Sequence, residues 1–416
     1  MRALAVIDGE HYGPVVRDAL AALPYEVVAA WLAGGTEKLI GGEDYGVSLV
    51  ADLEAGIAEH GPELVVDLSD EPVLGPRERF RVASRVLALG LPYIGADFRL
   101  DPPELAPFPI PSLAVVGTGK RVGKTAVTGR AARLLAQDRE VVVVAMGRGG
   151  PPEPEVADVR PTLELLLELS RQGRHAASDY LETAALAGVV TIGCRRCGGG
   201  LAGAPGESNV LAGAALAAER EPDLVVFDGS GAAIPPVDVG ARVLVTSAAQ
   251  PVEVVTGYLN AFRILISDLV VVTGSADARL LEAIAEVKEL PVVSVELRPR
   301  PAVPVADRRV ALFSTAPTSA HETLARHLEE QHGALVTHVS GNLARRDALR
   351  AELERVDADV YLVEIKAAAI DVVAEAALSQ GRELVFADNE LVTEGDLDAE
   401  LLAVAEKAAA REVVAP

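Results

Sequence analysis

The sequence predicts an α/β protein whose parallel sheets are covered by helices on both faces. Short, wholly apolar runs alternate with helix-length segments along most of the 416 residues, as buried parallel strands require. Two proline-rich stretches, 101–111 and 298–304, interrupt this alternation and are interpreted as linkers. They predict an N-terminal α/β domain (1–108), a central domain (109–300) and a smaller C-terminal α/β domain (301–416).

Apolar runs and helical periodicity place the elements within each domain. In the N-terminal domain we expect strands at 4–7, 26–30, 64–67 and 93–94, and helices near 13–22, 47–59 and 76–89. In the central domain we expect strands at 113–117, 141–146, 189–192, 224–228, 242–246, 269–273 and 292–295, with helices beginning near 124, 161, 177, 208, 251 and 276. In the C-terminal domain we expect strands at 309–313, 334–339, 359–364 and 383–387, with helices between them. The central pattern is typical of a doubly wound parallel sheet, in which ligands bind beyond the carboxyl ends of the strands.

The central domain opens on a glycine-rich loop between a strand and a helix. The loop reads Gly117-Thr118-Gly119-Lys120-Arg121-Val122-Gly123-Lys124-Thr125. Backbone N–H groups and the helix N-terminus of such a P-loop bind phosphates, while Lys124 is expected to reach the β- and γ-phosphates of ATP and Thr125 to ligate Mg²⁺. Thr118 stands where the strict spacing has glycine, and the loop is one residue longer than the common form. The alternative is a glycine-rich turn that binds nothing.

A second motif of the central domain carries an acidic residue. The apolar strand at 224–228 ends in Asp228-Gly229-Ser230-Gly231, which matches a Walker-B-like position. Asp228 would then hold Mg²⁺ on the far side from Thr125, directly or through water, and the glycines would leave room for the γ-phosphate. The alternative is an ordinary Asp-Gly turn.

Arginines form a third group of candidates. Arg148 follows the strand at 141–146, whose end should lie beside the γ-phosphate, so it is expected to neutralise transferred charge, with Glu153 or Asp158 holding metal-bound water. A surface loop with a solvated arginine is the alternative. Arg130 and Arg133, on the helix after the P-loop, are expected to be solvated.

The segment Cys194-Arg195-Arg196-Cys197 is followed by glycines, and Ser208 or Asn209 is expected to cap the next helix. Paired arginines beside glycines suit a polyphosphorylated ligand, because the guanidinium fork binds phosphate bidentately. The two cysteines are expected to be reduced structural thiols, and a Cys₄ zinc site shared across a dimer is the alternative.

Composition limits the partners. The net charge of −23 argues against nucleic acid and anionic membranes, and two of only six lysines, Lys120 and Lys124, lie in the P-loop. The chain opens on a strand and has no apolar stretch of membrane-spanning length, so we expect a cytoplasmic protein without a membrane partner. Two cysteines also fit a reducing compartment.

The loop at 117–125 resembles that of dethiobiotin synthetase and its relatives, in which Gly-Thr-x-x-x-Val-Gly-Lys-Thr recurs. Taken whole, the chain is more similar to the cyclic 2,3-diphosphoglycerate synthetase family, through the P-loop and the segments 146–151, 194–199 and 227–231. Where the biotin enzyme's loop is neutral or acidic, this chain carries Lys120 and Arg121, as a substrate with two phosphates would need.

The resemblance implies ATP-dependent closure of an intramolecular phosphoanhydride in 2,3-diphosphoglycerate, with Mg²⁺, possible K⁺ activation and a homodimer. The candidate residues are Lys124, Lys120 and Arg148 for catalysis, residues 117–125 for the nucleotide, Arg148, Arg195 and Arg196 for the substrate, and Thr125 and Asp228 for the metal. Lys124 is expected to act from a surface loop, so that its loss spares the fold. The alternatives are a dethiobiotin-synthetase-like ligase for another anionic substrate, a regulatory or metal-delivering P-loop ATPase, and a non-catalytic nucleotide-binding module.

Overall fold

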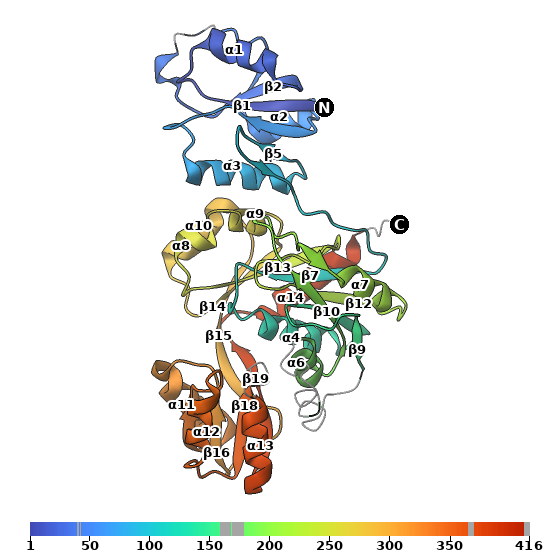
Figure 1. Ribbon diagram of the computed structural model, residues 1–416, viewed down its shortest axis with the longest axis vertical. Helices are drawn as coiled ribbons and strands as arrows, with labels where there is room; N and C mark the ends of the chain where they lie inside the picture. Colours follow the sequence, from blue (N-terminus) through green and yellow to red (C-terminus); the bar gives the residue numbers. More distant parts are fainter. Residues whose placement is uncertain (40, 42, 159–167, 169–178, 365–369, 412–416) are drawn as a thin grey trace.

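The computed structural model describes residues 1–39, 41, 43–158, 168, 179–364 and 370–411. Figure 1 shows three units stacked along the long axis, with the N-terminal unit (blue) and the C-terminal unit (orange to red) on either side of the central one. The N-terminal unit has its own largely parallel sheet, and the central and C-terminal units share a second one. Helices flank both sheets, so the predicted α/β fold class is confirmed. The helix expected from residue 161 lies outside the described residues.

The N-terminal unit is a six-stranded sheet in the order β3-β2-β1-β4-β5-β6. Its elements are β1 (Arg2–Ile7), α1 (Gly13–Ala22), β2 (Glu26–Leu32), β3 (Leu49–Val50), α2 (Leu53–His60), β4 (Leu64–Asp67), α3 (Pro76–Ala88), β5 (Tyr93–Ile94) and β6 (Arg99–Leu100). Helix α2 begins later than its predicted start near 47, because the Asp52 carboxylate caps it by accepting a hydrogen bond from the Ala55 N–H (2.9 Å).

The central unit holds the strand order β11-β10-β8-β12-β7-β13-β14-β15. Its strands are β7 (Ser112–Gly117), β8 (Val141–Gly147), β9 (Glu155–Ala157), β10 (Val190–Cys197), β11 (Glu207–Ser208), β12 (Leu224–Asp228), β13 (Ala241–Ser247), β14 (Leu269–Thr273) and β15 (Val292–Pro301). Its helices are α4 (Lys124–Leu135), α6 (Asp179–Ala187), α7 (Val210–Ala218), α8 (Val252–Val255), α9 (Asn260–Leu265) and α10 (Ala278–Val287). All neighbours from β10 to β15 are parallel, so their carboxyl ends share one edge of the sheet.

Helices cover both faces of the central sheet. Apolar side chains of α4, among them Val127 and Leu135, form one core with side chains on one face of β7 and with helix α14 (Leu397–Ala410), the last helix among the described residues. The opposite face of β7 shares a core with α7, α9 and α10. In Figure 1 the red helix α14 accordingly lies in the central unit. The domain boundaries drawn from the sequence stay predictions, and this helix packs on the central sheet.

The N-terminal unit contacts the central one through α3 and α9, which face each other in Figure 1. The Ser84 hydroxyl on α3 donates a hydrogen bond to the Tyr258 carbonyl (3.2 Å), and the Phe80 and Tyr258 rings meet edge to face at 5.8 Å. Apolar residues of α3 such as Val86 belong to the same buried cluster as Phe262 on α9. This shared core orders the first unit against the second.

The C-terminal unit continues the central sheet in the order β15-β19-β18-β16-β17. Its elements are β16 (Arg309–Phe313), α11 (His321–His332), β17 (Leu335–Ser340), α12 (Arg346–Leu353), β18 (Val360–Glu364), α13 (Ile370–Gln380) and β19 (Glu383–Val392). The linker predicted at 298–304 is wrong for its first part, because β15 runs on to Pro301 and pairs there antiparallel with β19. Pro299 and Pro301 are two residues apart along β15, so the N–H groups that they lack fall on the same side of the strand. This half of β15 pairs with β19 on one side.

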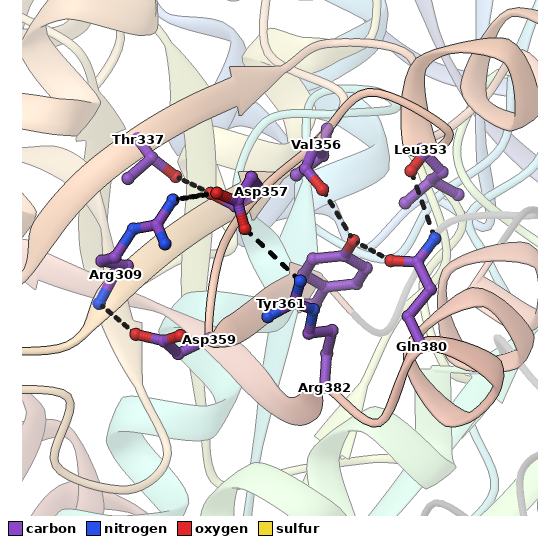
Figure 2. A network of polar contacts seen from close by, with 9 residues as sticks. All are labelled: Arg309, Thr337, Leu353, Val356, Asp357, Asp359, Tyr361, Gln380 and Arg382. Carbon is purple, nitrogen blue, oxygen red and sulfur yellow. Dashed lines mark hydrogen bonds and ion pairs between the residues drawn. The ribbon is translucent and has the colours of Figure 1, made fainter.

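A polar network fixes the start of the C-terminal strands (Figure 2). The Asp357 carboxylate accepts hydrogen bonds from Arg309 (2.6 Å), the first residue of β16, and from Arg382 (3.3 Å), which precedes β19. Arg309 holds the pKa of the Asp357 carboxyl below its usual range. On the same edge, the Tyr361 hydroxyl of β18 donates to the Gln380 side chain (2.5 Å) at the end of α13. The network therefore anchors the loops at the edge opposite to the strand carboxyl ends.

Helix α4 is also tied to the C-terminal segments. The expectation of a solvated side chain holds for Arg130, which is 43% exposed, and is wrong for Arg133, which is 21% exposed. Arg133 forms an ion pair with Asp388 of β19 (2.8 Å), and burial lowers the pKa of its guanidinium. Arg130 donates to the Asp398 carboxylate of α14 (2.9 Å). The helix that follows the P-loop is thus held by residues far along the chain. Among the described residues, no helix has the length and apolar content needed to cross a membrane.

Candidate nucleotide and phosphate site

The P-loop is supported from the neighbouring strand β13. The Thr118 N–H donates to the Val245 carbonyl (3.0 Å), and the Thr118 hydroxyl contacts the side-chain oxygens of Gln250 (2.7 Å) and Thr246 (3.0 Å). These contacts account for threonine where the strict motif has glycine, because its buried hydroxyl fastens the loop to β13. Gln250, which the sequence did not single out, therefore helps to hold the first turn of the loop.

The middle of the loop has a left-handed backbone at two positions. Arg121 has φ of 64° and Gly123 has φ of 86°, and a Cβ at Gly123 would stand 2.6 Å from the Thr273 methyl carbon. The Thr273 hydroxyl donates to the Val122 carbonyl (3.2 Å), so β14 supports the loop from below. Lys120 and Arg121 are both exposed. The loop thus exposes two cations, Lys120 and Arg121, while its backbone is held by β14.

Lys124 is buried rather than held in an exposed loop, which corrects the expectation drawn from the sequence. Its ammonium nitrogen lies 2.5 Å from Oδ1 of Asp228, and the Thr128 hydroxyl donates to the same oxygen (2.9 Å). The Lys124 side chain is 9% exposed and that of Asp228 is fully buried. The strand register brings Lys124 and Asp228 together, because β12 is the parallel neighbour of β7 and Asp228 lies beside Val115, just before the P-loop.

The donor set beside this pair fits a magnesium ion. Oδ2 of Asp228 is buried and has no hydrogen-bond partner among the described residues, so a negatively charged oxygen is left for a cation. Thr125 supplies a hydroxyl from the first turn of α4. Hard oxygen ligands of this kind, few in number and next to bound phosphates, are those that Mg²⁺ prefers.

Arg148 and Arg196 meet beyond the end of β12. A Cβ built at Gly231 would lie 2.8 Å from a terminal nitrogen of Arg148 and 3.6 Å from one of Arg196, so both guanidinium groups lie over this glycine. Arg196 also donates to the Ser230 carbonyl (2.7 Å). Burial, and then the nearby Arg148, lower the pKa of the Arg196 guanidinium. Among the described residues neither arginine forms an ion pair, so the two cations share a surface suited to a polyanion.

Arg195 does not join this pair. Successive side chains of a strand point to opposite faces, and Arg195 precedes Arg196 on β10 and is exposed. Its N–H donates to the side-chain oxygen of Asn209 (2.7 Å), whose amide in turn donates to the Pro151 carbonyl (3.2 Å). Asn209 therefore links two loops of the site instead of capping α7, and Ser208 accepts the Val210 N–H (3.1 Å).

The cysteines lie on opposite faces of β10. Cys194 is buried, which raises the pKa of its thiol to about 12, whereas Cys197, three residues further along the strand, is exposed. Thiols on opposite faces do not suit a shared metal ion.

Asp158 lies beyond strand β9, which runs antiparallel along β10. Its carboxylate oxygen is 3.9 Å from a guanidinium nitrogen of Arg220, and its side chain is 61% exposed. Asp158 therefore lies toward the start of β10. The sequence analysis had placed it at the other edge of the sheet, beside the carboxyl ends of the strands.

Arg263 is a buried residue that sequence reasoning missed. Its guanidinium donates to the carbonyls of Ala232 (2.7 Å), Leu259 (2.8 Å) and Leu201 (3.2 Å). It thereby joins the loop after Asp228 to the glycine-rich loop after β10. All its hydrogen-bond partners among the described residues are neutral oxygens, and burial lowers its pKa to about 10. A single arginine within the apolar run 261–266 is the signal that the sequence offered.

We expect Arg263→Met to lower the free energy of unfolding by about 2–4 kcal/mol, because buried carbonyls lose their charged donor. Urea denaturation measures this loss. Arg279→Met, on the exposed side of α10, is the matched control and should change stability by less than about 0.5 kcal/mol. Equal stability of the two variants would show that Arg263 does not hold the loops together.

Comparisons with known proteins agree over most of the chain. Three family models match it: the N-terminal domain of cyclic 2,3-diphosphoglycerate synthetase over residues 2–101, its P-loop domain over 112–300 and its C-terminal domain over 301–390. A solved structure, the "apo" form of LpxK from Aquifex aeolicus in complex with ATP, gives a TM-score of 0.43 at 13% identity over 72% of this chain and 90% of that one. A likeness this weak assigns nothing.

Curated relatives named cyclic 2,3-diphosphoglycerate synthetase align over nearly full length. The protein from Rubrobacter xylanophilus is 53% identical over 98% of each chain. Those from Thermococcus gammatolerans and Methanothermobacter thermautotrophicus are 44% and 38% identical, over 94% and 98% of this chain and 93% and 96% of theirs. The three matched domains and these relatives together show that the chain belongs to the cyclic 2,3-diphosphoglycerate synthetase family.

Proposed function

We propose that this chain is an ATP-dependent ligase that closes the phosphoanhydride ring of cyclic 2,3-diphosphoglycerate from 2,3-diphosphoglycerate, releasing ADP and phosphate. The observation that carries the proposal is the position of Arg148 and Arg196, two unpaired cations among the described residues that meet over Gly231 beside the Lys124–Asp228 pair. A P-loop alone accounts for ATP, whereas the second group of cations suits an acceptor that itself carries phosphates.

The chemistry takes two displacements. An oxygen of one substrate phosphate attacks the γ-phosphorus of ATP, the bond to the bridging oxygen breaks, and ADP leaves. An oxygen of the other substrate phosphate then attacks the phosphorus of the activated one, forms the P–O–P ring and expels the former γ-phosphoryl group as inorganic phosphate. The protein contributes positioning and charge stabilisation rather than a covalent intermediate.

Roles for the residues follow from charge and place. Residues 117–125 bind the nucleotide, with Lys124 on the β- and γ-phosphates and Lys120 on the approaching anion. Arg148 and Arg196 take the substrate phosphates and the charge of the transition state. Thr125 and Asp228 hold Mg²⁺, which when bound neutralises phosphate charge.

We further propose Mg²⁺ as the metal, K⁺ as an activating ion, a homodimer as the assembly and the cytoplasm as the location. The unpartnered oxygen of Asp228 supports Mg²⁺. The other three proposals rest on the family resemblance. Sedimentation equilibrium measures the assembly directly, and a monomer at micromolar concentration would contradict the homodimer.

The experiment that tests the function is ADP release with different acceptors. We expect turnover with 2,3-diphosphoglycerate and at most background hydrolysis without it. Turnover on a different anionic acceptor alone would favour a ligase closer to dethiobiotin synthetase. Hydrolysis at the same rate without any acceptor would favour a regulatory ATPase, and no turnover under any condition would favour a nucleotide-binding module.

Arg196→Ala should impair use of the substrate more than Arg195→Ala, because only Arg196 lies beside Arg148. One lost charge-assisted contact is worth roughly 1.5–3 kcal/mol, or about 10- to 100-fold in kcat/KM for 2,3-diphosphoglycerate, while ATP affinity stays within a few-fold. Steady-state kinetics with each substrate varied separately measure both effects. A collapse of ATP binding alone in the Arg196 variant would place this residue on the nucleotide instead.

A further inference from the structure

Three potential metal ligands gather in the C-terminal unit, away from the P-loop. His327 and His332 lie on α11, and Glu390 lies on β19. Nε2 of His327 lies 2.9 Å from Oε1 of Glu390, and Nε2 of His332 lies 4.0 Å from the same oxygen. The two imidazole rings stand 5.5 Å apart, centre to centre. Among the described residues, this is the one group of three or more His, Cys, Asp or Glu side chains whose ligand atoms lie close enough to hold a metal ion.

The cluster is sheltered from solvent, and one of its nitrogen atoms lacks a partner. The exposed fractions of the side chains are 11% for His327, 22% for His332 and 28% for Glu390. Nε2 of His332 is buried and accepts or donates no hydrogen bond among the described residues. A sheltered imidazole nitrogen without a partner is unfavourable unless something binds it.

The charge around the cluster also suits a metal. The nearest cation, Arg300, donates to the Asp388 carboxylate (2.7 Å), which offsets part of its repulsion of a bound ion.

We propose that His327, His332 and Glu390 bind a divalent transition-metal ion of the Zn²⁺ class. Two imidazole nitrogens and one carboxylate oxygen form a donor set that zinc uses, with a fourth position left for water, whereas Mg²⁺ prefers oxygen ligands alone. Ligand atoms around tetrahedral zinc stand roughly 3.3–3.5 Å apart, as follows from bonds of about 2.0–2.1 Å. The Nε2 atoms of His327 and His332 lie 2.9 and 4.0 Å from Oε1 of Glu390, and these two distances bracket that value.

The position indicates a structural role. The ion would fasten the last two turns of α11 to β19. Two residues before Glu390, on the same face of that strand, Asp388 binds Arg133 of the P-loop helix. The metal site therefore steadies the strand that supports α4, and it stands independently of the proposed function.

Zinc binding to the full chain tests the proposal. The protein is stripped with a chelator, then dialysed against Zn²⁺ with millimolar Mg²⁺ present, and the zinc bound per chain is measured by mass spectrometry. We expect about one tightly bound zinc in the wild type. His332→Gln and Glu390→Gln should each weaken zinc binding by about 100-fold or more, since loss of an outer-shell partner alone costs ~10–100-fold.

His338→Gln is the matched control. His338 also contacts a carboxylate, that of Glu352 at 2.7 Å, in the same unit, but belongs to no three-ligand group among the described residues. This variant should keep its zinc. Far-UV circular dichroism checks that each variant is folded, and cobalt added in place of zinc should give the intense visible absorption of a tetrahedral site. Absence of tight zinc in the wild type, or full zinc in both ligand variants, would overturn the proposal.

Discussion

Lys124→Ala is expected to reduce ATP-driven turnover to less than a tenth of the wild-type rate. The ammonium group lies at the start of α4 within reach of phosphates bound in the loop, and no other buried cation among the described residues occupies that position. The variant should also lose stability, because it leaves the Asp228 carboxylate buried without its cation. Breaking a buried ion pair in this way costs about 3–5 kcal/mol.

Two measurements separate these effects. Single-turnover ADP release at a temperature where the variant is folded reports the chemistry, and urea denaturation reports the stability. Lys407→Ala is the control, because its ammonium pairs with Asp268 (2.6 Å) but is 63% exposed, so both quantities should barely change. Turnover above a tenth of wild type in folded Lys124→Ala would remove this lysine from the mechanism.

Asp228→Asn should lower kcat by roughly 10²–10³, the loss expected for one preorganised electrostatic group. An amide keeps the shape of the side chain and can still accept from Thr128 and Lys124, but it removes the negative charge that the unpartnered Oδ2 offers to a cation. The concentration of Mg²⁺ that gives half-maximal rate should therefore rise, by about 10- to 100-fold. Titration of the rate with Mg²⁺ at fixed ATP measures the shift.

The control for this charge is Asp238→Asn. Asp238 pairs with Arg411 (2.7 Å) and is 37% exposed, and its replacement should leave the Mg²⁺ dependence within about twofold. If Asp228→Asn lowered kcat with an unchanged Mg²⁺ titration, Asp228 would act by orienting Lys124 and not by holding the metal.

The central part of the fold could be predicted because its signals are local. Wholly apolar runs locate β7 and β12, and the glycine-rich loop can follow only a strand that ends at 117. Parallel pairing then brings the ends of β7, β12, β8 and β10 to one edge. The meeting of Asp228 with the P-loop follows from this topology.

Features that depend on distant partners could not be predicted. The composition of 298–304 favours a linker, yet antiparallel pairing with β19, about ninety residues away, keeps 298–301 in a strand. Arg133 looks solvated in the helical pattern, but Asp388 binds it. Arg195 and Arg196 are equivalent in composition, and only the alternation along β10 separates the residue beside Arg148 from its neighbour. Burial of Lys124 likewise depends on Asp228, more than a hundred residues later.

The most direct test of the account is ³¹P NMR of the protein mixed with ATP, Mg²⁺ and 2,3-diphosphoglycerate. Ring closure converts two monoester phosphates into a phosphoanhydride. Both monoester signals should therefore decrease together, and new signals should appear upfield, in the anhydride region. ADP and inorganic phosphate should appear in equal amounts to the new product. Release of ADP and phosphate while both monoester signals of 2,3-diphosphoglycerate persist would contradict the account.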